Sequence, residues 1–95
     1  GIPVKPIRDG RLIEASIDNH DNYFVKIDLG NGWEVEYIHI ANDALFKKIR
    51  KRLREEGPFF VFRKDTVAYV GQSGNAKNKG KKKLFIDKYM PKSFD

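Results

Sequence analysis

The sequence predicts a small, mainly β domain with one helix in its middle. Three observations predict this class. Apolar and polar residues alternate over most of the chain up to about residue 40, which is the two-residue period of half-buried strands. A helical apolar period then appears once, over about 42–56. Short apolar segments bounded by glycine, proline or lysine follow the helix, and they indicate two or three further strands.

Size and composition predict one domain over residues 1–95. A chain of 95 residues and 11.0 kDa buries roughly 60–65% of its unfolded surface, which suffices for a single small core. The 40% hydrophobic and 34% charged residues are typical of a folded chain. The absence of cysteine excludes a disulfide framework, and no apolar run is long enough to span a bilayer. We expect a cytoplasmic, intracellular protein without a membrane partner.

The first elements are an arm and a strand. Two prolines favour an extended arm over residues 1–6. The strand begins near Arg11, and strict alternation places Ile13, Ala15 and Ile17 on one face.

A turn and a hairpin connect the next strands. Side chains that cap their own backbone cluster at residues 18–22, which predicts a turn. The second strand follows over residues 23–29, and Gly30-Asn31-Gly32 is a tight hairpin signal. A third strand runs from Trp33 to about Ile40.

The third strand changes its apolar phase. Strict alternation places Val35 on one face of the strand, whereas it places Ile38 and Ile40 on the opposite face. A bulge or bend near residues 36–37 would shift the alternation and so reconcile the two phases. Such bends also curl sheets into barrels. Beyond this bend, we expect Tyr37 and His39 to share the outer face.

The helix is predicted over about 42–56. Asn42 is the expected N-cap, with Asp43 in the first turn. Leu45, Ile49 and Leu53 form a narrow apolar stripe, and Gly57-Pro58 ends the helix. The opposite face carries six basic residues: Lys47, Lys48, Arg50, Lys51, Arg52 and Arg54.

Strands and a loop follow the helix. Residues 59–62 read Phe-Phe-Val-Phe, a strand that is apolar on both faces. Residues 66–70 either continue it or follow a turn at 64–65. The segment 71–83 has five lysines and no acidic residue, which predicts a flexible loop. A last strand is expected over 84–90.

This order of elements resembles the oligonucleotide/oligosaccharide-binding (OB) fold, a five- to six-stranded Greek-key barrel whose helix lies between strands three and four. The resemblance is one of topology and covers about residues 7–90. It implies a binding face on strands two and three, flanked by the 18–22 turn and the 71–83 loop. It also implies similarity to single-stranded nucleic-acid-binding proteins.

Charge is concentrated in the second half of the chain. The net charge is +6, of which residues 1–41 contribute −3 and residues 42–95 contribute +9. A basic, glycine-punctuated loop can follow a phosphate backbone and release its counterions. The predicted phosphate-binding residues of this loop are Lys77, Lys79, Lys81, Lys82 and Lys83.

Aromatic residues near basic ones are candidates for base stacking. Phe24 lies on the polar face of the second strand beside Lys26, so we expect it to be exposed. Trp33 at the hairpin, together with Tyr37 and His39, completes the predicted nucleic-acid site.

Three carboxylates oppose this assignment, because Asp28, Glu34 and Glu36 are predicted on the same outer face and repel phosphate. They either confine binding to part of the face or indicate that the face is used differently.

Catalysis and metal binding lack a motif. The two histidines lie apart, in a turn and on a strand, and no residue set predicts a triad or a metal site. The segment 74–82 departs from phosphate-loop spacing by one residue and has lysine where serine or threonine is required. We expect no enzyme activity, no cofactor and no metal.

The predicted function is therefore binding of single-stranded nucleic acid, with DNA favoured over RNA. Two alternatives stay open. The Phe59–Phe62 strand predicts a protein–protein interaction module of a larger complex or a homodimer. The basic helix beside a sheet also permits duplex DNA binding.

Overall fold

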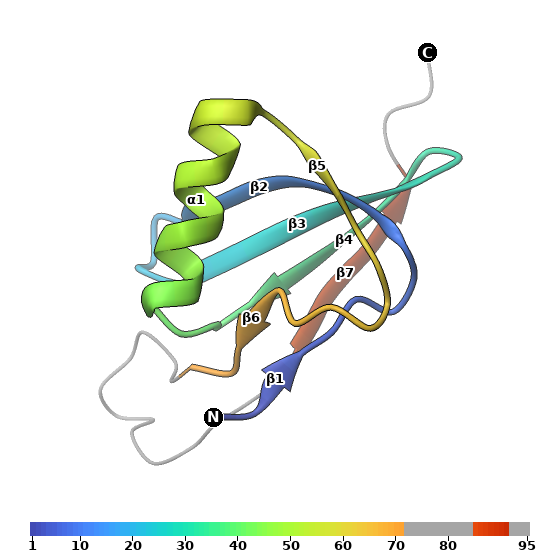
Figure 1. Ribbon diagram of the computed structural model, residues 1–95. Helices are drawn as coiled ribbons and strands as arrows, with labels where there is room; N and C mark the ends of the chain where they lie inside the picture. Colours follow the sequence, from blue (N-terminus) through green and yellow to red (C-terminus); the bar gives the residue numbers. More distant parts are fainter. Residues whose placement is uncertain (72–84, 92–95) are drawn as a thin grey trace.

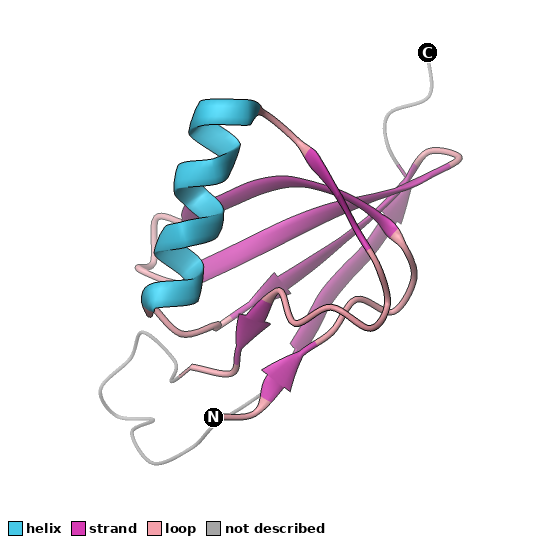
Figure 2. Cartoon of the chain, viewed as in Figure 1, coloured by secondary structure: helices cyan, strands magenta, loops and turns pink. Residues whose placement is uncertain are grey.

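The chain folds into a mainly antiparallel β structure with one described helix (Figures 1 and 2). The computed structural model describes residues 1–71 and the backbone of 85–91; residues 72–84 and 92–95 lie outside it. The described elements are β1 (Pro3–Val4), β2 (Gly10–Ile17), β3 (Tyr23–Gly30), β4 (Trp33–Ile38), α1 (Ala44–Glu56), β5 (Phe59–Val61), β6 (Ala68–Tyr69) and β7 (Phe85–Pro91).

The larger sheet has five antiparallel strands in the order β5-β2-β3-β4-β7. The consecutive strands β2, β3 and β4 form a meander, β5 adds beside β2, and β7 adds beside β4. Strands β5 and β7 are the two edges, so the described sheet is not a closed barrel. The mainly β class and the helix before β5 are confirmed.

The N-terminal arm belongs to the fold. Residues 1–6 are extended, but β1 pairs with β6 in a second sheet, with Val4 opposite Ala68. Val4 is only 1% exposed and lies in the core. Its carbonyl oxygen accepts a 3.0 Å hydrogen bond from the amide of Val67. The predicted arm therefore has a strand partner at β1 and a buried side chain at Val4.

The core lies between the five-stranded sheet, the β1–β6 pair and α1 (Figure 1). The helix contributes Phe46 and Ile49, which are buried, and Leu45 and Leu53, which are partly buried, as its apolar stripe predicts. The Phe46 ring meets Tyr23 edge to face, with centroids 5.2 Å apart. No helix in the described ranges has the length and apolar character needed to cross a membrane.

Asp43, not Asn42, is the N-cap of α1. Its carboxylate oxygen Oδ1 accepts a 3.0 Å hydrogen bond from the amide of Phe46, so the helix begins at Ala44. At the other end, Gly57 adopts a φ of +80° and donates its amide to the Leu53 carbonyl over 2.9 Å. Glycine provides this left-handed conformation without a Cβ clash, and the predicted end is confirmed.

A bulge changes the face pattern of β2. Leu12 pairs with Ile27 and Glu14 pairs with Lys26, which leaves Ile13 as the additional residue. Leu12 and Ala15 consequently point into the core, whereas Ile17 is 38% exposed. The prediction that Ile13, Ala15 and Ile17 share one buried face is wrong, because strict alternation takes no account of a bulge.

The change of face near the end of β4 occurs at His39. Tyr37 still pairs with Val25 and continues the inward phase of Val35. His39 has a φ of +67°, and this left-handed residue returns the next side chain, Ile40, to the core. The register irregularity beside Glu36 and Tyr37 is in the partner strand β7. The predicted bend is therefore two to three residues too early.

The predicted turns are confirmed. Asp18 uses Oδ1 to accept the amides of His20 and Asn22, at 2.8 and 3.0 Å. Asn31, between two glycines, takes a φ of +54° in the hairpin. Asp65 closes a turn after β5, where its amide donates to the Phe62 carbonyl and its carboxylate accepts the Phe62 amide. Residues 66–70 therefore follow a turn and do not continue β5.

Candidate nucleic-acid interface

Two of the predicted stacking rings are buried. Tyr37 is 1% exposed because the inward phase of β4 continues through it, and its hydroxyl accepts the Ile7 amide at 2.9 Å. Phe24 is 9% exposed. It lies on the central strand β3, where Ser16 and Ile38 flank it in the neighbouring strands. The expected exposure of both rings is wrong.

Lys26 is the centre of a row of alternating charge. The register places Glu14 and Glu36 directly opposite it on β2 and β4. Its ammonium nitrogen lies 3.5 Å from the Glu14 carboxylate and 3.8 Å from the Glu36 carboxylate. A lysine between two carboxylates has little attraction left for a phosphate. Glu14 and Glu36 therefore determine the charge of this face around Lys26.

The other predicted residues are distributed differently. Trp33 is 40% exposed at the start of β4, opposite Gly30 of the hairpin, so part of its ring is open to a ligand. His39 is half-buried and lies beyond the end of β4. Tyr37 and His39 do not share an outer face, since Tyr37 is in the core. The five lysines of the 77–83 segment lie outside the described residues.

The exposed basic surface is on α1. All six of the helix's basic residues are exposed, namely Lys47, Lys48, Arg50, Lys51, Arg52 and Arg54. Within the described part of the chain, only Arg52 among them forms an ion pair, with Glu56 at 3.4 Å between Nε and Oε1. This pair is exposed and contributes little stability. The helix therefore presents a concentrated positive charge to solvent.

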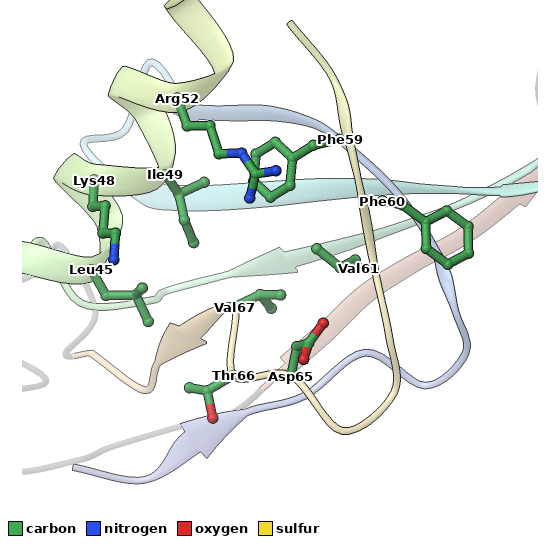
Figure 3. Close-up of a pocket in the computed structure, with 10 residues that line it drawn as sticks. All are labelled: Leu45, Lys48, Ile49, Arg52, Phe59, Phe60, Val61, Asp65, Thr66 and Val67. Carbon is green, nitrogen blue, oxygen red and sulfur yellow. The ribbon is translucent and has the colours of Figure 1, made fainter. Parts of the chain in front are cut away.

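A pocket of about 290 Å³ lies between α1, β5 and the segment before β6 (Figure 3). The Arg52 guanidinium covers the Phe59 ring, 3.9 Å from its centroid, at the helix side of this pocket. Lys48 projects from the preceding turn of α1. Asp65 lies on the opposite side, across an apolar floor formed by Leu45, Ile49, Val61 and Val67.

Two exposed phenylalanines lie beside this pocket. Phe60 and Phe62 are 54% and 48% exposed, and their rings meet at 5.0 Å between centroids with an interplanar angle of 72°. Phe60 is one of the residues that line the pocket, and its ring extends to the side of β5 away from the helix (Figure 3). Arg11 is its cross-strand partner on β2. The double-faced strand therefore carries more aromatic surface than the core holds, as the sequence indicates.

This aromatic pair is absent from the predicted nucleic-acid site, and its strand was predicted to form a protein contact. The detectable signal was a Phe-x-Phe pattern followed at once by Arg63 and Lys64, both of which are exposed. Such a pattern places rings and cations together at one edge of a sheet. The register then adds Arg11, which no local pattern can predict.

The described surface thus offers a ligand positive charge, exposed rings and one partly apolar pocket beside the helix. Among the described residues, no group of three or more histidine, aspartate or glutamate side chains is placed to hold a metal ion. Comparison with known proteins finds no protein-family model, no curated protein and no solved structure that matches this chain.

Proposed function

We propose that this protein binds single-stranded nucleic acid without catalysis, with DNA favoured over RNA. The observation that carries the proposal is the exposed Phe60–Phe62 pair with cations on its flanks. Cationic side chains neutralise phosphates, and aromatic rings stack on bases whatever their sequence. The path that we propose follows α1 and β5 and continues to the lysines of the 77–83 segment.

The geometry of the aromatic pair suits stacking. In an edge-to-face arrangement, one ring leaves both faces uncovered by its partner and the other leaves one, and both residues are about half exposed. A base that covers an open face also removes exposed apolar surface from water. Stacking of one base on a protein ring contributes roughly 1–3 kcal/mol. Trp33, at the hairpin, is a further exposed ring for the same strand.

The charge distribution supports a path along the helix side. The helix carries six basic and two acidic side chains, a net charge of +4 over thirteen residues. The outer face of β2, β3 and β4 instead presents the row in which Glu14 and Glu36 flank Lys26. A polyanion is attracted to the first surface and gains little at the second.

The strand order supports a fold proposal as well. The order β5-β2-β3-β4-β7 places the β2–β4 meander between two later strands on opposite edges, which is compatible with a Greek-key arrangement. Pairing of β5 with β7 would close such a sheet into a barrel. We propose that the domain is OB-like, with the α1 and β5 side as its binding region.

Binding of fluorescent oligo-dT, oligo-rU and duplex DNA, followed by polarisation at low and moderate salt, tests the function. We expect oligo-dT to bind most tightly and the double variant Phe60→Ser with Phe62→Ser to lose about 5-fold to 100-fold in affinity for each stacked base. Ile17→Ser is the matched control, because Ile17 is also an exposed apolar residue of the sheet. The proposal fails if no oligonucleotide binds at low salt, or if the double variant binds as tightly as the control.

The same aromatic pair favours a second candidate, a protein–protein interaction module. A homodimer or a larger complex formed through Phe60 and Phe62 would be insensitive to salt, since apolar burial drives it. Light scattering coupled to size-exclusion chromatography separates the candidates. A dimer that the double variant abolishes, together with no oligonucleotide affinity, would establish the second; a preference for duplex DNA would assign binding to the basic helix face.

A further inference from the structure

We infer that the pocket between α1 and β5 is a subsite for one unpaired nucleotide, with its base inside and its phosphate on Lys48 and Arg52. The inference rests on the proposed function and extends it, because it places one nucleotide of the strand away from the Phe60–Phe62 pair. Three features support the inference, namely the volume of the pocket, the cations on its rim and the carboxylate opposite them.

The size of the pocket limits what it can hold. Its volume of about 290 Å³ is just below the range for small-molecule sites, which begins near roughly 300 Å³. This space admits one planar ring system and not a helix or a paired duplex. The floor of Leu45, Ile49, Val61 and Val67 is apolar, as the face of a nucleobase requires.

The helix side of the pocket is built for an anion. Lys48 and Arg52 are four residues apart and so project from one face of α1. The Arg52 guanidinium carbon lies over the Phe59 ring, 3.9 Å from its centroid, which holds this cation at the pocket. Only Nε faces Glu56, while the two terminal nitrogens have no hydrogen-bond partner among the described residues. Lys48 likewise has no ion pair with a described carboxylate.

The opposite side of the pocket gives the ligand its direction. Asp65 is held there because one carboxylate oxygen accepts the Phe62 amide at 2.8 Å and its own amide donates to the Phe62 carbonyl at 3.0 Å. A fixed carboxylate repels phosphate and accepts hydrogen bonds from an amino group of a base. The cations and Asp65 lie across the pocket from each other (Figure 3). A nucleotide matches this polarity, with phosphate at the helix and base edge at Asp65.

An acidic peptide fits the pocket less well. Its carboxylates would pair with Lys48 and Arg52, and an apolar side chain would occupy the floor. Such a side chain offers no donor to Asp65, which would be left with the Phe62 amide and any backbone amide of the peptide that reaches it. Cytosine presents an exocyclic amino group as this donor, whereas uracil has at the same position a carbonyl oxygen, which a carboxylate repels. The pocket is therefore expected to prefer cytidine monophosphate to uridine monophosphate.

Methyl-resolved NMR of the full chain tests the occupant directly. We expect cytidine monophosphate to shift the methyl signals of Ile49, Val61 and Val67 and to give NOEs from its base protons to them. Uridine monophosphate, cytidine and ribose 5-phosphate should each bind more weakly. Shifts of these methyls by an acidic, phenylalanine-containing peptide but not by any mononucleotide would overturn the inference in favour of a protein partner.

Charge-matched variants test the role of the subsite in strand binding. Lys48→Gln and Arg52→Gln remove cations that line the pocket, while Lys51→Gln and Arg54→Gln remove the same charges from the same helix outside it. We expect Lys48→Gln to weaken oligo-dC binding and to reduce the log–log salt slope by about 0.7, the value for one phosphate contact on a single strand. The matched controls should have clearly smaller effects. Equal effects of the pocket variants and their controls would overturn the subsite.

The outcomes separate the subsite from the proposed function. If oligonucleotides bind but neither the methyl signals nor the matched variants distinguish the pocket, the subsite is wrong and single-strand binding stands. If no oligonucleotide binds, both are wrong, even where a mononucleotide enters the pocket. Oligonucleotide binding with NOEs from a base to Ile49 or Val67 supports both.

Discussion

The hydroxyl oxygen of Tyr37 accepts a hydrogen bond from the backbone amide of Ile7, 2.9 Å away, and so joins β4 to the segment between β1 and β2. The rest of the Tyr37 ring is in the core, with 1% of the residue exposed. Tyr37 is therefore a structural residue, although its place on a strand beside histidine made it a candidate for base stacking. Its position gives a direct way to separate stability from binding.

Tyr37→Phe is expected to lower the free energy of unfolding by about 1–3 kcal/mol, because it leaves the partly buried Ile7 amide without its acceptor. Oligonucleotide affinity should not change. Urea denaturation and fluorescence polarisation measure the two effects. A loss of affinity in a variant that remains fully folded would return Tyr37 to the binding site.

Lys26→Gln is expected to leave oligonucleotide affinity within about two-fold of wild type, since Glu14 and Glu36 already hold the ammonium. Each of these partly exposed ion pairs contributes roughly 0–1 kcal/mol, so stability should fall only slightly. Lys48→Gln is the comparison of equal charge. If Lys26→Gln weakens binding as much as Lys48→Gln does, phosphate does reach the outer sheet face.

The turn after β2 predicts a pH dependence. The backbone amide of Asn22 is the main cause of the lowered pKa of Asp18; lost hydration opposes it, and the His20 amide adds to it. A depressed pKa stabilises the folded state above the ordinary value of 3.8 and loses this effect as the pH falls through the lowered pKa. The stability advantage of wild type over Asp18→Asn should therefore be full at neutral pH and shrink below about pH 4. A constant difference down to pH 2 would contradict this.

Gly71 lies where no side chain fits. A Cβ atom there would be 2.6 Å from the carbonyl carbon and oxygen of Ile40 and 2.7 Å from the amide nitrogen of Ala41. Since these are backbone atoms, Gly71→Ala should destabilise the fold by about 1–3 kcal/mol. Gly1→Ala is the control, because its Cβ would meet Tyr69 at an ordinary 3.6 Å. Equal melting temperatures for the two variants would show that the backbone of Ile40 and Ala41 can move away from residue 71 at little cost.

Local patterns predicted the elements that depend on local physics. The side chain of Asp18 and the lack of one at Gly57 determine a turn and a helix end within a few residues, and both features are confirmed. The left-handed His39 and the bulge at Ile13 were missed, because each depends on how neighbouring strands cross. The pairing of Val4 with Ala68 joins segments 64 residues apart, which no periodicity reveals.

The candidate site was predictable only in part. Exposed phenylalanines in the 59–62 strand and the basic face of α1 follow from the sequence. The contact between the helix and this strand does not follow from the sequence, because the contact between Arg52 and Phe59 depends on the path of β5 past the helix. Alternation also placed Lys26 outward correctly without showing that two glutamates lie directly opposite it.

The pairing of β1 with β6 has a consequence for biosynthesis. Tyr69 and Ala68, the partners of Pro3 and Val4, are made more than sixty residues after them. Until Tyr69 and Ala68 have been made, Val4 and the β2–β4 meander of the nascent chain lack the residues that later cover them. Folds that depend on contacts between distant residues typically fold slowly. The backbone contacts of β1 therefore form only after the β2–β4 meander has been made, and arrest of synthesis before residue 70 should leave a chain that proteases cleave readily around Val4.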